Sequence, residues 1–338
     1  MFHTHKMHPE FLGLKLRAVA GESAYPSDKE IGVELELEGF GAGYMAGIPS
    51  DYWKAHADPS LRGDCIELCL RHPLTLREFE DKAIPEFDKI KEKSDFKPAL
   101  SARCSVHVHL DFSHKTVYAL YKFITLYALL EECFFDVVGK NRRGNPFCLR
   151  LSDAPGFVQD GITAFSDKRL AYFHAENNRY MALNLASLYK FGSVEIRLHS
   201  GEHESDKIVQ WVRVLHELMC FAVKSPMSPS EILQGISMHG FRGFLRAELP
   251  ITYRFIADVP HVYESVGIDV AQDFAFACQW PTPEELERKS ESEDVWGTIV
   301  NPEGLKPWKN AGAAAAARKM RVIPMGLDID PPDAEFGE

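Results

Sequence analysis

Four short segments of the chain carry charged side chains at alternate positions, with apolar residues between them. They are 31–38 (IGVELELE), 65–69 (CIELC), 105–111 (SVHVHLD) and 193–199 (SVEIRLH). Successive side chains of a β-strand point to opposite faces, so each segment predicts a strand with one apolar and one charged face. The charged residues are carboxylates, imidazoles and one arginine, where an ordinary outer face carries scattered Lys, Thr and Ser. We therefore expect a sheet whose charged face is functional.

Carboxylates crowd this face. Glu34, Glu36 and Glu38 would lie about 6–7 Å apart, and at an effective dielectric constant of about 20 each neighbouring pair costs roughly 2–3 kcal/mol. A bound cation or a phosphate-binding site would offset that repulsion. Because carboxylate oxygens are hard ligands, Glu34, Glu36 and Glu67 favour Mg²⁺ or Mn²⁺ over zinc. The sequence thus predicts a metal site on a sheet face.

Other residues of the charged face have two interpretations. His107 and His109 could join the site, one as a metal ligand and one against a phosphate or a base, and His109 is equally consistent with a hydrogen-bonded structural role. Glu38 is more typical of a solvated carboxylate at a strand end. Glu195 and Arg197 could form a cross-strand ion pair.

A Glu-x-Arg pair on one face also suits phosphoryl transfer. The carboxylate can hold a metal, and the guanidinium can stabilise charge on the transferring group. The chain has neither a Walker A motif nor a kinase-like glycine loop, so a P-loop explanation fails.

Composition limits the class of protein. The 338 residues carry a net charge of −11, which argues against broad binding to nucleic acid or to an anionic membrane. The seven cysteines include no CxxC pair and favour a reducing compartment. The most apolar stretch, 117–138, contains four charged residues and predicts a core helix rather than a membrane span. Charged residues also interrupt the N-terminus, so no signal peptide is expected. We expect a soluble, cytoplasmic protein.

Periodicity and turn residues divide the chain into elements. The expected strands are 30–38, 64–70, 103–112, 180–186 and 192–199. The expected helices are 76–91, 116–139 (ended by Gly139) and one capped by Ser205 or Asp206 that runs to 223. Residues 152–177 lack periodicity and predict a loop or lid. Strands mixed with long helices, without a βαβ rhythm, predict an α+β fold around an antiparallel sheet.

Four regions follow from these elements. We expect an irregular entry at 1–29, a catalytic domain at 30–223, a proline-interrupted accessory region at 224–310 and a mobile tail at 311–338.

A series of motifs occurs in a specific order: GVELE at 32–36, DPSL at 58–61, IEL at 66–68, SVHVH at 105–109, NRR at 141–143 with FC at 147–148, RY at 179–180, LNL at 183–185 and VEIR at 194–197. Over roughly residues 30–222 they resemble the amidoligase family, which belongs to the carboxylate–amine ligases of the glutamine synthetase and glutamate–cysteine ligase superfamily. One departure is Pro59, where such families often carry glycine.

The resemblance implies a curved antiparallel sheet with helices on its outer face and a concave face that binds ATP and two or more Mg²⁺ (or Mn²⁺) ions. By this analogy one ion, bridging the nucleotide phosphates, is held by Glu34, His107 and Glu195. A second ion, nearer the acceptor carboxylate, is held by Glu36 and Glu67.

The resemblance also implies roles for other residues. Arg197, Arg179 and Arg143 would contact phosphate oxygens, and Asn184 would position a substrate or a strand end. His109 is also expected to contact the nucleotide. The expected catalytic residues are Arg197, Glu195, Arg179 and Glu38. The general base stays open between Glu38 and Asp111.

The implied activity is ATP-dependent amide formation, through an acyl phosphate, between a small-molecule or peptide carboxylate and an amine. Two alternatives stay open. The His107-Val-His109 motif with Asp111 is similar to the opening motif of the amidohydrolases, which are metal-dependent hydrolases, although their βα rhythm is absent. The second alternative is a binding module: a protein with the ligase fold that has lost its catalytic activity. Bulk nucleic-acid binding is not expected, and the sequence names neither the substrates nor the oligomeric state.

Overall fold

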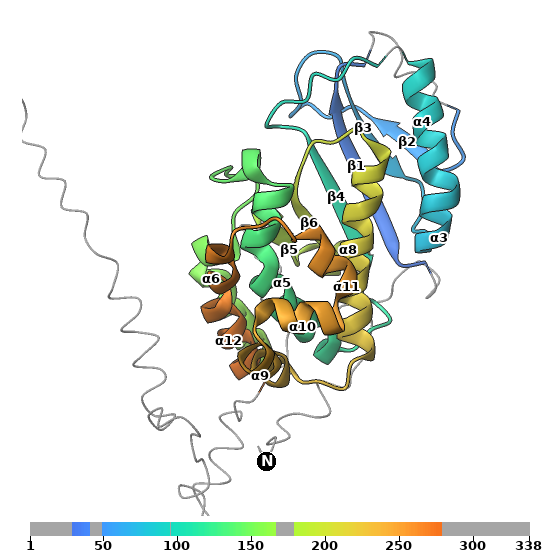
Figure 1. The fold of residues 1–338 in the computed structure, drawn as a ribbon. Coiled ribbons are helices and arrows are strands. Elements are labelled where there is room, and N and C mark those ends of the chain that lie inside the picture. Colours follow the sequence, from blue (N-terminus) through green and yellow to red (C-terminus); the bar gives the residue numbers. More distant parts are fainter. Residues whose placement is uncertain (1–28, 41–48, 95, 167–178, 279–338) are drawn as a thin grey trace, which may run out of the picture. The chain divides into compact units, whose positions relative to one another are not determined.

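The computed structural model describes residues 29–40, 49–94, 96–166 and 179–278, which form an α+β fold (Figure 1). Within these residues one six-stranded sheet has the order β2-β3-β1-β4-β6-β5, and every neighbouring pair is antiparallel. The strands are β1 (Ile31–Glu38), β2 (Trp53–His56), β3 (Cys65–Leu70), β4 (Ser105–Asp111), β5 (Leu183–Asn184) and β6 (Ser193–Ser200). The predicted fold class and antiparallel sheet are confirmed.

The alternation in the sequence separates the two faces of the sheet as predicted. The apolar side chains of β1 are no more than 1% exposed: Ile31, Val33, Leu35 and Leu37. They belong to one hydrophobic core with residues of the helices. The first helical run consists of α3 (Leu76–Glu78), a π-helical turn (Phe79–Ala83) and α4 (Ile84–Lys93). It matches the helix predicted at 76–91, and Thr75 caps it in a capping box with Glu78.

The long helix α5 (Val117–Val137) confirms the helix predicted from 116, with Thr116 as its N-cap. Its end differs from the prediction, because Val138 is the C-cap and Gly139 has a φ of −119° rather than a left-handed conformation. A Cβ atom on Gly139 would lie 2.9 Å from a side-chain carbon of Leu198. Close packing of β6 explains this glycine.

Helix α8 (Ser205–Lys224) contacts β4, and Figure 1 shows it in yellow along the sheet. The side chains predicted to face inward are all buried: Ile208, Trp211, Val212, Leu215 and Met219. The predicted cap is wrong. The N-cap is Glu204, which makes no side-chain capping bond, and the hydroxyl of Ser205 instead donates to Asp88 of α4.

Three further elements differ from the sequence expectations. Residues 155–166, part of the predicted loop or lid, form α6 (Pro155–Ser166), while 167–178 lie outside the described residues. The strand predicted at 180–186 pairs over only two residues, as β5. The edge strand β2 was not predicted.

Several helices follow α8 in the same compact unit. They are α9 (Pro229–His239), α10 (Phe241–Glu248), α11 (Pro250–Phe255), a 3₁₀ helix (His261–Ser265) and α12 (Ile268–Ala277). Three shorter elements lie earlier in the chain: 3₁₀ turns at Lys140–Arg142 and Leu151–Asp153, and α7 (Ser187–Phe191). The predicted mobile tail and residues 1–28 of the predicted entry lie outside the described residues.

Helix α12 packs on α5. The ring of Phe274 lies 6.1 Å from that of Tyr121, and a Cβ atom on Gly267 would lie 1.8 Å from the carbonyl oxygen of Ala128. No helix in the described ranges combines the length and apolar character that crossing a lipid bilayer requires.

A β-bulge interrupts the alternation of β6. Val108 pairs with Ile196, whereas Val106 pairs with His199, so β6 has one extra residue between these pairs. Paired residues share a face, and His199 therefore lies on the apolar side, with its ring 5.7 Å from that of Trp211. Burial lowers the pKa of His199 to about 4. The sequence pattern had placed this residue on the charged face.

Candidate functional site

Strand pairing brings the charged residues of β1, β3, β4 and β6 together on one face. Glu34 is opposite His107, Glu36 is opposite Glu67, and His109 is opposite Glu195. Directly opposite side chains have Cβ atoms about 4.5–5.5 Å apart. The register alone therefore makes neighbours of residues that are up to 86 positions apart in the chain (195 − 109).

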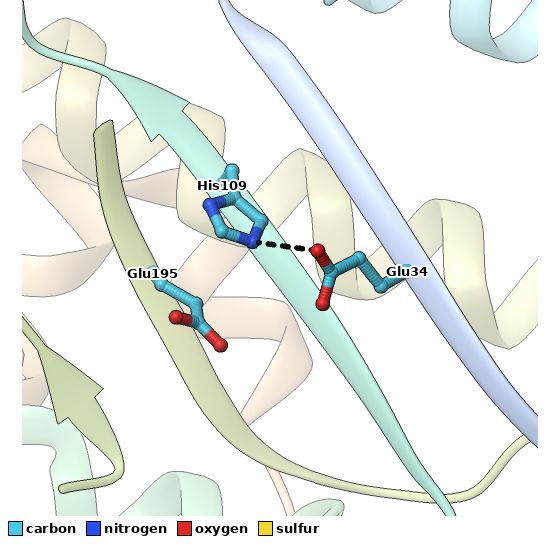
Figure 2. A group of neighbouring side chains, drawn as sticks. All are labelled: Glu34, His109 and Glu195. Carbon is cyan, nitrogen blue, oxygen red and sulfur yellow. Dashed lines mark ion pairs between the residues drawn. The ribbon is translucent and has the colours of Figure 1, made fainter. Parts of the chain in front are cut away.

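One group has the spacing of metal ligands. Glu34, His109 and Glu195 each offer a ligand atom within 4.8 Å of the others, and Figure 2 shows the three side chains converging from three adjacent strands. His109 Nδ1 lies 3.0 Å from the Ser193 hydroxyl. This contact fixes the ring so that Nε2 lies 3.4 Å from Glu34 Oε1. Nε2 is buried and makes no hydrogen bond within the described part of the chain.

A second group consists of carboxylates. Glu36, Asp58 and Glu67 also place ligand oxygens within 4.8 Å of one another. Asp58 lies in the loop between β2 and β3, where its carboxylate accepts hydrogen bonds from the backbone N–H and the hydroxyl of Ser60. The sequence analysis did not name Asp58 as a ligand, although the DPSL motif was a signal. A third group, Glu34, Glu67 and Cys69, lies between the first two.

The charges of these groups are unevenly balanced. Burial, together with the charges of Glu34 and Glu36, raises the pKa of Glu67 to about 7. Burial also works against ionisation of Glu34, but the hydrogen bond from His107 and the nearby charge of His109 outweigh it and lower the pKa of Glu34. Negative charge is therefore compensated around Glu34, whereas around Glu67 the neighbouring carboxylates outweigh the charge of Arg197. A cation near Glu67 would remove that imbalance.

His107 uses both ring nitrogens within the protein. Nδ1 lies 3.1 Å from Glu34 Oε2, and Nε2 lies 2.7 Å from the hydroxyl of Ser105, which in turn donates to Glu36. The ring is 2% exposed. His107 thus connects the two carboxylate groups through hydrogen bonds, while His109 occupies the position of a ligand in the first group. The roles that the resemblance gave the two histidines stay predictions.

Glu195 is held on both oxygens. Arg197 Nη1 donates to Oε1 at 2.5 Å, and Asn184 Nδ2 donates to Oε2 at 2.6 Å. The ion pair runs along β6 rather than across strands. Burial opposes ionisation of Glu195, but the charges of His109 and Arg197 outweigh it and lower the pKa of Glu195. Glu195 therefore stays an anion between a histidine and an arginine.

Two predicted carboxylates lie at the margins of the charged face. Glu38 is 5% exposed and accepts hydrogen bonds from the backbone N–H of Arg62 and the hydroxyl of Ser101. It joins two loops rather than facing solvent at a strand end. Asp111 accepts a hydrogen bond from the backbone N–H of Ser113 at the other end of the face.

Two predicted arginines have partners away from these carboxylates. Arg143 pairs with Glu132 of α5 and lies over the rings of Phe135 and Tyr263. Arg179 is exposed, and its guanidinium lies 4.6 Å from the ring centre of its neighbour Tyr180. Their predicted phosphate contacts stay predictions that the geometry does not support.

Comparison with known proteins gives one finding. No curated protein matches the chain. Residues 75–219 match a family described as "Putative amidoligase enzyme". The matched segment contains β4, β6, α5 and most of α8, and therefore His107, His109, Glu195 and Arg197. This match confirms the amidoligase resemblance drawn from the motifs over residues 75–219.

Proposed function

We propose that the protein is an ATP-dependent carboxylate–amine ligase that forms an amide bond through an acyl-phosphate intermediate. The observation that carries the proposal is the convergence of Glu34, His109 and Glu195 on a sheet face next to Glu36 and Glu67. The amidoligase match over β4 and β6 supports it. We also propose that the sheet is of the glutamine synthetase and glutamate–cysteine ligase type, with its charged face as the substrate face.

The residues present fit divalent cations. Both groups consist mainly of carboxylate oxygens, which suit Mg²⁺ or Mn²⁺. His109 Nε2 is buried and makes no hydrogen bond to the described residues, and the carboxylates around Glu67 outweigh the positive charge of Arg197. Glu34, His109 and Glu195 would hold one ion, and Glu36, Asp58 and Glu67 a second. Such ions supply charge neutralisation to the phosphates of ATP.

The proposed reaction has two balanced steps. An oxygen of the acid substrate bonds to the γ-phosphorus of ATP, and the bond to ADP breaks. The nitrogen of the amine then bonds to the acyl carbon, the carbon–oxygen bond to phosphate breaks, and the amine gives up a proton.

Arg197 is the group that the protein supplies to the phosphoryl-transfer step. Its guanidinium is held in place by Glu195, and its Nε makes no hydrogen bond to any residue that the structure describes. It can therefore stabilise charge on the transferring phosphoryl group without changing its orientation.

The experiment that tests this function uses the purified full chain with ATP, Mg²⁺, hydroxylamine and a panel of carboxylates. We expect a hydroxamate and ADP in equal amounts for the acid substrate. Glu195→Gln should lower the rate of formation of both products by about 10²-fold or more. The matched control is Glu80→Gln, which breaks an ion pair with Arg213 on the helices and should leave both unchanged.

Two outcomes would overturn the proposal. ATP-independent hydrolysis of amides would make the protein a metal-dependent hydrolase. The absence of ADP release, together with the absence of any thermal stabilisation by nucleotide or Mg²⁺, would make it a binding module.

A further inference from the structure

A pocket of about 120 Å³ lies on the charged face beside the first ligand group. Glu34 and His109 line both the pocket and that group. The pocket extends from them toward Glu30 and Asp111, at the end of the face where β1 begins and β4 ends. A molecule bound there would touch the proposed reaction centre.

The charges of the lining favour a cation. Three carboxylates line the pocket, Glu30, Glu34 and Asp111, and its described lining includes no arginine or lysine. Glu30 is neutralised by Lys115 and His216. A negatively charged ligand, such as a carboxylate or a phosphate, has no partner of opposite charge in this lining except the two histidines, His72 and His109.

Asp111 is the lining carboxylate that has a buried oxygen without a hydrogen-bond donor among the described residues. Its side chain is 6% exposed, and Oδ1 accepts from the backbone N–H of Ser113 at 2.8 Å. Oδ2 is buried and accepts no hydrogen bond from the described residues. A buried carboxylate oxygen without a donor is costly. A donor that enters the pocket with a positive charge would supply what Oδ2 lacks.

Apolar side chains form another part of the wall, beside His72 and Ser193. Leu70, Pro73 and Phe191 line the pocket, and the ring of Phe191 meets that of His109 edge to face, with 5.8 Å between the ring centres. A dry cavity of about 150 Å³ holds a benzene molecule. A pocket of about 120 Å³ therefore suits an ammonium group with a short alkyl chain.

We propose that this pocket binds the amine substrate, as the aminoalkyl end of a primary amine. The ammonium group lies at Asp111, and the alkyl chain packs against Leu70, Pro73 and Phe191. The identification of this amine as a substrate rests on the proposed ligase function, whereas its binding does not. The pocket thus assigns the amine side of the reaction to cationic amines rather than to anionic ones.

The test is calorimetric titration of the full chain, without ATP, by three probes of equal size: n-propylamine, 1-propanol and propionate. We expect n-propylamine to bind at least about tenfold more tightly than the other two, because only it brings a charged donor. Asp111→Asn should weaken n-propylamine about tenfold or more. The matched control is Asp81→Asn, an exposed residue paired with Arg77, which should change nothing.

A second variant keeps the proposal testable if Asp111→Asn fails to fold. Phe191 is 41% exposed at the pocket, and Phe191→Ala should weaken n-propylamine more than it weakens ammonium ion, which has no alkyl chain. Equal binding of n-propylamine and 1-propanol would overturn the proposal, and so would an n-propylamine affinity that the folded variants leave unchanged.

The two proposals fail separately. If hydroxamate forms in an ATP-dependent reaction but Asp111→Asn leaves the amine affinity unchanged, the pocket assignment is wrong and the ligase proposal stands. If n-propylamine binds selectively but no hydroxamate forms with ATP, the pocket binds an amine and the ligase proposal is wrong.

Discussion

The side-chain amide of Asn184 donates a hydrogen bond of 2.6 Å to Oε2 of Glu195. The orientation of the amide is itself fixed, because its oxygen accepts a hydrogen bond from the backbone N–H of Ala186. A neutral partner orients Glu195 and leaves its charge intact. Asn184 therefore acts on the ligand group through Glu195.

This relationship gives the first prediction. Asn184→Ala should lower Mg²⁺ affinity or turnover by about 10–100-fold, the usual effect of removing a residue that orients a metal ligand. Asn184→Asp should cost more, because two carboxylates would then face each other. ADP release and Mg²⁺ titration measure the two effects. Equal activity in Asn184→Asp and the unchanged protein would show that Asn184 does not orient Glu195.

The ion pair on β6 gives the second prediction. Glu195→Gln and Arg197→Ala should each lower turnover by about 10²-fold or more, because each removes a preorganised charge from the proposed site. Steady-state ADP release measures the loss. The matched changes Glu80→Gln and Arg213→Ala break an ion pair outside the site and should be neutral. Near-normal turnover in folded β6 variants would remove their proposed roles.

His199 gives the third prediction, which concerns pH. Burial lowers its pKa to about 4 in the folded protein, while the unfolded chain takes up the proton near pH 6.5. Acid therefore favours unfolding: the loss begins as the pH falls below about 6.5 and is complete near pH 4. Its size is about 3 kcal/mol of unfolding free energy.

Substitution of this histidine should flatten that dependence. We expect the unfolding free energy of His199→Phe to fall less between pH 7 and pH 4 than that of the unchanged protein. Chemical denaturation at several pH values measures the difference. His239→Gln removes an exposed histidine and should retain the full dependence. Parallel pH curves for the unchanged protein and His199→Phe would contradict the buried position of this ring.

Two glycines give the fourth prediction. Gly267→Ala should destabilise the protein by about 1–3 kcal/mol, because the added Cβ would meet the backbone of α5 at 1.8 Å. Gly243→Ala on α10 has its nearest contact at 3.7 Å and should stabilise by up to about 1 kcal/mol. Thermal unfolding distinguishes them. Effects of the same sign and size would show that α12 does not pack against α5 as described.

The strands that carry the site were predictable because their signal is local. In β1 and β4 every second residue is apolar, and a two-residue period is enough to assign both faces. Once the strands pair, that period also brings Glu34, His109 and Glu195 together. The order of the motifs along the chain carried the family resemblance. The strand register determines which of their side chains are in contact.

The remaining differences come from contacts that a local pattern does not contain. The position of His199 depends on a bulge, which exists only when β4 and β6 pair. Asp58 reaches Glu36 and Glu67 from a loop that has no period. In α6, Gly161 weakens the helical pattern, yet a Cβ there would lie 2.4 Å from the ring of Phe274. Gly161 looks like a helix breaker in the sequence, but the close packing of α12 against α6 requires a glycine at this position.

Helix α5 shows how contacts between elements that are distant in sequence determine which part of the chain can fold by itself. Almost every side chain from Val117 to Phe135 is buried, including Lys122, Glu131 and Glu132. A helix enclosed on all sides cannot fold as the outer layer of a two-layer domain. A shortened chain that ends after α8 would lose α12 and leave an apolar helix open to water, so it should aggregate. The polypeptide up to Ala277 is therefore the smallest piece that we expect to express as a stable protein.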